Sequence, residues 1–325
     1  MKNIQMKATA VLFAALLPGA ASAAISKADM EKYFDLGYQT KKAPEKDDKI
    51  SPMYQYAYAS RVDFAKLEHD RPLTQDFLCK LTVDDILALD QEAADQLYAR
   101  LSAGPIPDGV YDGKAKIMDG SAFKTIVKLF THEEERKGIL GRLMSWWTAD
   151  SVAGLLDNLA NTMWSGKHFF KNEKVLRNVI PENDRAGQML GVLVKGFDYK
   201  TLKAKDVTIK GQTIKAWELF PAKLYCGQSL MDSRRESVLI DYAYSDTVAG
   251  YQEPIDFLAS RQGLYVRDEI RMVRPGLYLG KAYLNRMFFL TFVLHNPEVD
   301  KQNTGRSDWA SMQECWTGTQ KQGYL

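Results

Sequence analysis

Asp241 is a charged residue inside an apolar, strand-like run of the sequence, SVLIDYAY. In an extended strand it shares a face with Leu239 and Ala243, because side chains alternate between the two faces. A carboxylate on an apolar face is costly unless a cation pairs with it. Such a group either braces the fold as half of an ion pair or holds the polar end of a ligand, and the sequence leaves both interpretations open.

The segment RDEIRMVR contains the cations that could pair with Asp241. Its side chains alternate between two strand faces, one with Arg267, Glu269 and Arg271 and the other with Asp268, Ile270 and Met272. We expect Asp241 to contact Arg271 or Arg267. In a catalytic site, Asp241 and Asp268 would be the acid or base. The neighbours Asp268 and Glu269 point to opposite faces, which disfavours a shared acid–base pair.

The pattern aromatic–x–Gly–Lys occurs three times, at Tyr111–Lys114, Trp164–Lys167 and Tyr278–Lys281. In a strand, the aromatic residue and the glycine share a face and the lysine points to the other. A phosphate-binding loop needs a longer glycine-rich stretch that ends in Gly-Lys-Ser/Thr and opens a helix, whereas Ala or His follows the lysine here. We interpret each glycine as a strand bend or a space filled by a ring. If the rings line a cavity, the same residues contact a ligand.

The sequence carries no pattern typical of a metal site, a cofactor site or a serine nucleophile. Its four histidines form no HExxH motif, and neither a CxxC motif nor a G-x-S-x-G elbow occurs. We therefore expect no metal and no cofactor. Cys79, Cys226 and Cys315 permit one disulfide and one free thiol in an oxidising compartment, and their spacing does not fix the pairing.

Residues 1–23 have the order of a secretory signal peptide. Lys2 and Lys7 precede a short apolar run, and Ala21-Ser22-Ala23 forms a small–x–small cleavage site. We expect cleavage after Ala23 and export to the periplasm. The leader holds two of the 43 Lys and Arg and none of the 41 Asp and Glu, so the remaining chain is formally neutral. A neutral chain argues against a broad nucleic-acid-binding face.

Residues 24–103 have the pattern of a helical N-terminal arm. The stretch from Leu81 to Gly104 predicts a single helix with Thr82 as its N-cap and one apolar stripe from Ile86 to Leu101. Gly104 and Pro105 end this helix.

Residues 104–300 predict a β-barrel, because short apolar or alternating runs are separated by Gly, Pro, Asn and Asp. One of these runs, MLGVLVKGF (189–197), is expected to be a strand like the others. Residues 267–295 predict a three-strand meander with turns at Pro275-Gly276 and Asn285-Arg286. A helical insertion is expected over 121–163 and a C-terminal tail over 301–325.

Two stretches resemble the bacterial domain family that is named for its GXWXG motif. Gly109, Tyr111 and Gly113 stand at the motif positions, with Tyr in place of Trp. The family's following W-x-G-K-x-F strand is matched by Trp164, Gly166, Lys167 and Phe169. The likeness covers residues 104–296, includes the family's small β-rich domain of unknown function, and implies a lipocalin-like barrel with no established activity. The expected fold class is thus α+β and mainly β: a lipocalin-like antiparallel β-barrel with a helical N-terminal arm and a helical insertion.

Aromatic residues crowd the later strands, and a barrel of about eight strands is wide enough to hold one small ligand. We expect an exported soluble protein that binds a small apolar or amphipathic ligand, such as a lipid, inside the barrel. The expected ligand-binding residues are Tyr111, Trp164, Lys167, Phe169, Asp241, Tyr242, Asp268, Arg271 and Tyr278. Trp146 and Trp147 of the insertion either help to close the barrel end or contact a membrane surface.

Two alternatives belong to other classes of protein. The first is an enzyme of the isomerase, hydrolase or cyclase type that acts on such a ligand, and an unpaired carboxyl group in the barrel would favour it. The second is a structural or partner-binding envelope protein, which a completely filled barrel would favour.

The leader predicts the N-terminus of the exported protein. Protein recovered from the periplasm should begin at Ala24 when sequenced from its N-terminus, because the small residues Ala21 and Ala23 suit signal peptidase. Recovery of intact Met1 in the membrane fraction would contradict this expectation.

Overall fold

The computed structural model describes residues 25–35, 62–117, 163–194 and 197–317. The leader, Trp146, Trp147 and the expected helical insertion up to residue 162 lie outside these ranges. Within them, no helix has the length and apolar composition needed to cross a bilayer.

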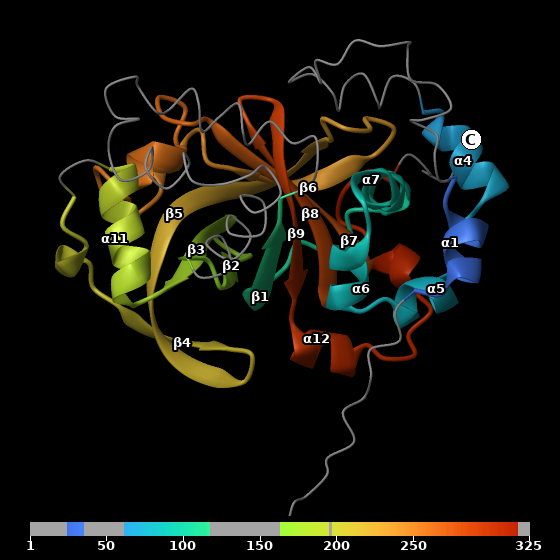
Figure 1. Cartoon of the computed structure of the whole chain (residues 1–325), viewed down its shortest axis with the longest axis horizontal. Coiled ribbons are helices and arrows are strands. Elements are labelled where there is room, and N and C mark those ends of the chain that lie inside the picture. The colour runs from blue at the N-terminus through green and yellow to red at the C-terminus, as the bar shows by residue number, and fades with distance from the viewer. Residues whose placement is uncertain (1–24, 36–61, 118–162, 195–196, 318–325) are drawn as a thin grey trace, which may run out of the picture.

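Nine antiparallel strands form one sheet, and eight of them close a barrel (Figure 1). The strands are β1 (Gly109–Lys116), β2 (Gly166–Phe170), β3 (Val175–Pro181), β4 (Lys205–Ile209), β5 (Gln212–Gln228), β6 (Glu236–Asp241), β7 (Val266–Arg274), β8 (Leu277–Leu284) and β9 (Met287–His295). The order is β3-β2-β1-β9-β8-β7-β6-β5, and pairing of β5 with β3 closes the barrel. The ninth strand, β4, pairs with the first part of the long strand β5. The expected lipocalin-like α+β barrel is confirmed.

The register identifies which side chains face the inside of the barrel. Ile270, Gly280 and Phe292 are direct neighbours across β7, β8 and β9, and they point inward. Arg271 and Leu279, each one residue away, pair with each other and point outward toward the helices. The expected division of RDEIRMVR between two faces and the meander of three strands are both confirmed.

The two ends of the barrel differ in the length of their connections. At the short-connection end, residues 171–174, 229–235 and 275–276 join neighbouring strands. At the long-connection end, residues 182–204 join β3 to β4 and residues 242–265 join β6 to β7. Strand β1 ends and strand β2 begins at this end as well. The turn Asn285-Arg286 also lies there, and both residues have the positive φ (45° and 70°) that a two-residue hairpin turn needs. Irregular segments therefore concentrate at one mouth of the barrel.

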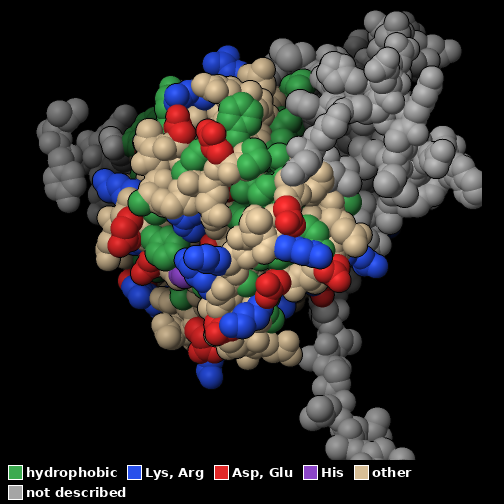
Figure 2. Space-filling view, turned by 90° about the vertical axis from the view of Figure 1, so that its left-hand side faces the viewer, with side chains coloured by type: hydrophobic (Ala, Val, Ile, Leu, Met, Phe, Trp, Pro, Cys, Tyr) green, Lys and Arg blue, Asp and Glu red, His purple; other side chains and the backbone are tan. Residues whose placement is uncertain are grey.

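Short helices surround the barrel. They are α1 (Lys27–Tyr33), α4 (Phe64–Asp70), α5 (Gln75–Lys80), α6 (Val83–Ala88), α7 (Gln91–Arg100), α11 (Asp184–Leu193) and α12 (Pro297–Gln302), with single 3-10 turns η2 (Tyr199–Thr201), η3 (Ser245–Thr247), η4 (Asp256–Ala259) and η5 (Trp309–Met312). The N-terminal arm, from α1 to α7, lies on one side of the barrel and α11 on the opposite side (Figure 1). The face that carries α11 displays charges of both signs among apolar side chains (Figure 2).

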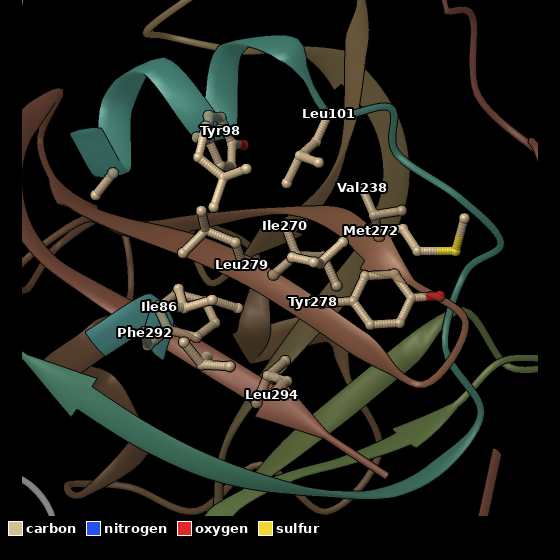
Figure 3. Packing of buried hydrophobic residues seen from close by; sticks show 14 of the residues in the cluster. Ile86, Tyr98, Leu101, Val238, Ile270, Met272, Tyr278, Leu279, Phe292 and Leu294 are labelled. Carbon is tan, nitrogen blue, oxygen red and sulfur yellow. The ribbon is translucent and has the colours of Figure 1, made fainter. Parts of the chain in front are cut away.

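The arm packs on the barrel through apolar contacts. All ten residues of α7 are buried. In Figure 3, Tyr98 and Leu101 approach the strands from the arm, above Leu279, while Tyr278 lies on the other side of the same strand. The wall of the barrel therefore has apolar packing on both of its faces, which is the main source of stability for both layers.

Three basic side chains of the barrel strands bind the ends of three arm helices. Arg271 donates to two carbonyl groups in the last turn of α7, Arg274 to two at the end of α5, and Lys116 to two at the end of α6. The last carbonyl groups of a helix lack partners within the helix and carry its partial negative charge. The arm is thus joined to the barrel at its helix C-termini.

The single helix expected from Leu81 to Gly104 is two helices. Thr82 caps α6 as predicted, in a reciprocal capping box with Asp85. Asp90 then caps α7 by accepting a hydrogen bond from the Ala93 amide at 2.8 Å. The prediction was wrong because a side chain that serves as a cap ends one helix and starts another even within a continuous apolar stripe.

The segment 189–197, expected to be a strand, continues α11 as far as Leu193. Asn183 starts this helix by accepting a hydrogen bond from the Ala186 amide at 2.9 Å. Ala186 and Leu190, four residues apart, are both buried and pack with Trp217 of β5. The helical spacing of buried residues begins at Ala186, before the apolar run starts at Met189. The run by itself therefore wrongly indicated a strand.

Two glycines of the repeated pattern lie under aromatic rings. A Cβ atom at Gly280 would lie 2.2 Å from the Phe292 ring, and one at Gly113 would lie 2.5 Å from the Trp164 ring. The prediction that a ring fills the space beside the glycine is confirmed for both.

The second copy of the pattern departs from simple alternation. Gly166 has a φ of +154°, and a Cβ atom there would lie 2.0 Å from a carbonyl oxygen of β1. Because β2 starts in this irregular way, Trp164 and Lys167 both contact the barrel interior. Lys114 and Lys281 point outward, as expected from the pattern.

The C-terminal segment returns to the barrel and is fixed there by a disulfide between Cys226 of β5 and Cys315. The amide and carbonyl groups of Trp316 also bond to Glu236 of β6. Both sulfurs are used in the bond, so these residues offer no thiolate to a metal. Cys79 is an exposed free thiol.

Gly280→Val should lower the free energy of unfolding by about 1–3 kcal/mol, the usual cost of overpacking a filled core. Urea unfolding of the variant and the parent measures the difference. In a Phe292→Ala background the ring is gone, and the same substitution should cost clearly less. An equal cost in both backgrounds would show that the ring is not what excludes the side chain.

Candidate functional site

The three lysines of the repeated pattern each pair with an aspartate. Lys114 meets Asp84 of α6 at 2.8 Å on the surface. Lys281 meets Asp95 of α7, and neither side chain is exposed. Both contacts join the arm to the barrel. The third lysine, Lys167, makes its contact inside the barrel.

Lys167, Asn178, Tyr242 and Asp268 form a hydrogen-bonded group in the barrel interior, which we call the polar cluster. The Lys167 Nζ atom donates to Tyr242 OH at 2.7 Å, Asp268 Oδ2 at 2.8 Å and Asn178 Oδ1 at 2.9 Å. Tyr242 OH donates to Asp268 Oδ2 at 3.2 Å, and Asn178 Nδ2 donates to Tyr242 OH at 3.0 Å. The cluster joins β2 and β3 to β7 and the end of β6, so it crosses the barrel.

Aromatic rings surround the ammonium group of Lys167. Its Nζ atom lies 5.4 Å from the ring centroids of Trp164, Tyr242 and Phe292. Trp164 also donates from Nε1 to Asn178 Oδ1 at 3.0 Å. Ring faces attract a cation, and the attraction is stronger where water is excluded.

Burial changes the proton affinities within the polar cluster. It lowers the pKa of the Lys167 ammonium group, and the facing Asp268 carboxylate offsets part of this change. Burial also raises the pKa of Tyr242 well above its usual range, and Asp268 adds to the effect. The phenol therefore stays protonated at neutral pH, while the lysine loses its proton more easily than a solvated one.

The other half of the interior, toward the short-connection end, is aromatic and apolar. The rings of Tyr111 and Phe169 are 5.5 Å apart, and those of Tyr111 and Tyr278 are 5.8 Å apart, all in edge-to-face contact. Tyr278 OH donates to the carbonyl of Pro105 at 2.8 Å. The interior thus has a polar region next to an apolar one.

Asp241 lies on the exterior face of β6. It is opposite Lys223 and Arg267 in the sheet, and its carboxylate accepts hydrogen bonds from Tyr225 OH and from the Ala243 amide. The expected ion pair with Arg267 or Arg271 was wrong. The sequence could show that Asp241 shares a face with Leu239, but not that this face is the outer one.

Arg271 also lies outside the barrel, beneath the arm. Its guanidinium group is fully buried and binds backbone carbonyl groups and the Ser237 hydroxyl. It is therefore far from solvent but does not belong to the polar cluster. The inward carboxylate of the segment is Asp268.

The structure brings together four of the expected site residues, Trp164, Lys167, Tyr242 and Asp268, and adds two that were not expected. Asn178 lies within the strand run VLRNVI, where an amide alternating with apolar residues was the available signal. Phe292 lies among several aromatic residues, and nothing in the sequence distinguished it before its contact with Gly280 was known.

The polar cluster combines several chemical groups in one hydrogen-bonded unit. The Asp268 carboxylate can accept a proton, the Lys167 ammonium group and the Tyr242 phenol can donate one, and Asn178 adds an amide. The ion pair has no net charge, so the cluster suits a polar but uncharged group of a small molecule. The fold and the cluster together define a lipocalin-like barrel with a polar group in its interior.

No family model matches the chain, and no curated protein matches it either. The resemblance to the GXWXG-motif family therefore stays a prediction. A solved structure, described as that of a protein from Thermomonospora curvata, is similar with 14% identity and a TM-score of 0.24 over 64% of this chain and 88% of that chain. At this TM-score the likeness adds nothing to the fold, which rests on the strand pairing.

Asp268→Ala should lower the free energy of unfolding by about 3–5 kcal/mol, because it leaves the buried ammonium group of Lys167 without its counter-charge. The double change Lys167→Met with Asp268→Leu should cost much less than the sum of the two single changes. Urea unfolding of the parent, Lys167→Met, Asp268→Leu and the double variant gives the interaction energy.

Asp241→Ala is the matched control for this measurement. Its carboxylate is half-buried on the exterior and makes two hydrogen bonds, so the change should cost about 1–2 kcal/mol. If Asp241→Ala lowered the free energy of unfolding as much as Asp268→Ala does, burial beside Lys167 would not be the reason that the loss of Asp268 is costly.

Proposed function

We propose that this protein binds a small amphipathic molecule inside the barrel, with the polar end of the ligand at the polar cluster and its apolar part against the rings. The observation that carries the proposal is the ion pair between Lys167 and Asp268 in an interior that is otherwise mostly apolar. Ligand pockets typically combine an apolar lining with a few fixed polar groups.

The strand pairing of the barrel does not account for this ion pair. Lys281 and Asp95 attach α7 to the barrel, but Lys167 and Asp268 lie on strands that the barrel already holds in one closed sheet. Apolar residues of the same volume often serve a buried position as well as an ion pair does. A role in ligand binding explains why charged residues stand at these interior positions, whereas packing does not explain it.

The charge of the polar cluster indicates the kind of head group. Lys167 and Asp268 neutralise each other at 2.8 Å, so a charged head group would find no unmatched opposite charge. A hydroxyl or carbonyl group can exchange hydrogen bonds with the members of the polar cluster, Lys167 and Asp268 included, without adding charge. We therefore propose an uncharged polar head.

The position of the polar cluster supports entry from the long-connection end. Asp268 and Tyr242 lie where β7 begins and β6 ends, at that mouth of the barrel. The neighbouring interior positions Ala115 and Ala282 have small side chains, and Ala282 is paired with Asp268. Binding sites in barrels commonly lie at the mouth that carries the longer loops.

We also propose that the protein acts after export. The leader-like pattern of residues 1–23 supports this, and so does the disulfide between Cys226 and Cys315, because such bonds persist in oxidising compartments.

An enzymatic role is the second candidate, favoured by the altered pKa values of Lys167 and Tyr242. Altered proton affinities within one buried group are typical of sites that transfer protons. In that case Asp268, rather than Asp241, is the candidate acid or base.

Binding of dodecanol tests the proposal, since this molecule has an uncharged polar head and an apolar chain. The parent protein should bind it, as measured by calorimetry. The double variant Lys167→Met/Asp268→Leu should bind it roughly tenfold or more weakly, because the head group loses hydrogen bonds worth about 1–1.5 kcal/mol each.

The double variant Lys281→Met/Asp95→Leu is the matched control, because it removes a buried ion pair outside the lumen. It should bind dodecanol as the parent does. Equal loss in both variants would mean that folding, not the polar cluster, governs binding. A parent protein that binds neither dodecanol nor any molecule retained in native mass spectrometry would overturn the proposal and favour a structural role.

A further inference from the structure

We propose that Lys167 forms a covalent imine with the carbonyl carbon of an apolar aldehyde, with Asp268 as counter-ion and Tyr242 as proton carrier. This inference rests on the proposed binding of an amphipathic ligand in the barrel. It names the chemical class of the ligand, an aldehyde with an apolar chain, and gives the buried amine a role in holding it.

The geometry of the polar cluster meets the requirements of imine formation. The reaction needs an amine, a group that accepts its proton, and a group that protonates the carbonyl oxygen. Asp268 Oδ2 and Tyr242 OH lie 2.8 Å and 2.7 Å from the Lys167 Nζ atom. The phenol and the carboxylate are themselves 3.2 Å apart, so a proton can pass between them.

The reaction balances in atoms and charge. The ammonium group first gives a proton to the Asp268 carboxylate, and the free amine then bonds to the carbonyl carbon while the π electron pair moves to oxygen. Through Tyr242 OH a proton passes from nitrogen to that oxygen, giving a carbinolamine. The carbon–oxygen bond then breaks, the Asp268 proton leaves with the oxygen as water, and the nitrogen keeps one hydrogen in a protonated imine.

The product suits the same surroundings as the lysine. A protonated imine carries one positive charge, so Asp268 remains its counter-ion and no unpaired charge is left in the barrel. The rings of Trp164, Tyr242 and Phe292 lie around the nitrogen and stabilise a cation there. Burial lowers the pKa of Lys167, which increases the fraction of reactive amine.

The second buried ion pair, Lys281 with Asp95, provides an internal comparison. Both of its side chains have no exposed surface, and the pair lies between α7 and β8. The side chains of Lys167 and Asp268 keep exposed fractions of 3% and 7% and lie inside the barrel. We therefore expect Lys167 to react and Lys281 to remain unmodified.

Reductive trapping tests this inference on the full chain. The protein is incubated with dodecanal and cyanoborohydride at neutral pH, which converts an imine to a stable secondary amine. Peptide mass spectrometry should find the dodecyl group on Lys167, at a level about tenfold or more above that on the average surface lysine, because the bound aldehyde is held next to the amine. Excess dodecanol should suppress this labelling.

Lys167→Arg cannot form an imine, so it should lose the labelled peptide. The control double variant Lys281→Met/Asp95→Leu should keep the label. If Lys167→Arg fails to fold, as judged by its thermal unfolding, the position of the label in the parent protein tests the imine instead. Dodecanol binding with label on surface lysines alone would overturn the imine and leave the binding proposal intact. Failure of both would overturn the binding proposal itself.

Discussion

The buried guanidinium group of Arg271 is the contact on which the arrangement of arm, barrel and strand connection depends. Its five N–H groups donate to the Ser237 hydroxyl and to four carbonyl groups, two in the last turn of α7 and two in the connection 229–235. Asp232 supplies a carboxylate oxygen at 3.9 Å. A lysine has too few donors and the wrong shape to bind all of these groups. One side chain thus fixes the end of a helix and the shape of a turn to the same strand.

The wall of the barrel uses its two faces for different kinds of contact. On the outer face, cations bind helix ends and carboxylates of the arm, and this assembles the two layers. On the inner face, the polar cluster satisfies its own hydrogen bonds and charge across the lumen. Asp268 and Glu269 are adjacent in the chain, yet Asp268 meets Lys167 inside and Glu269 meets Tyr98 and Arg267 outside. The period of two along a strand is what makes this separation possible.

The sequence was sufficient for the barrel, the meander and the glycines under rings, because these depend on local alternation and on turn residues. It named Lys167, Tyr242 and Asp268, which the fold brings into contact, but placed Asp241 with them. Deciding between two acids on neighbouring strands requires knowing which face closes inward, and closure depends on the pairing of β3 with β5, which no local pattern encodes. The break between α6 and α7 was missed for another reason: a cap at Asp90 competes with a continuous stripe, and propensity alone does not rank the two.

The alternation of β7 has a consequence for how such a protein can change over generations. Substitutions at Asp268 or Ile270 alter the side chains inside the barrel while leaving the outward contacts with the arm untouched. Substitutions at Glu269 or Arg271 do the reverse. The chemistry of the interior and the architecture are therefore inherited through different codons of one short strand, so a lineage can change the inside of the barrel without reworking the layers that surround it.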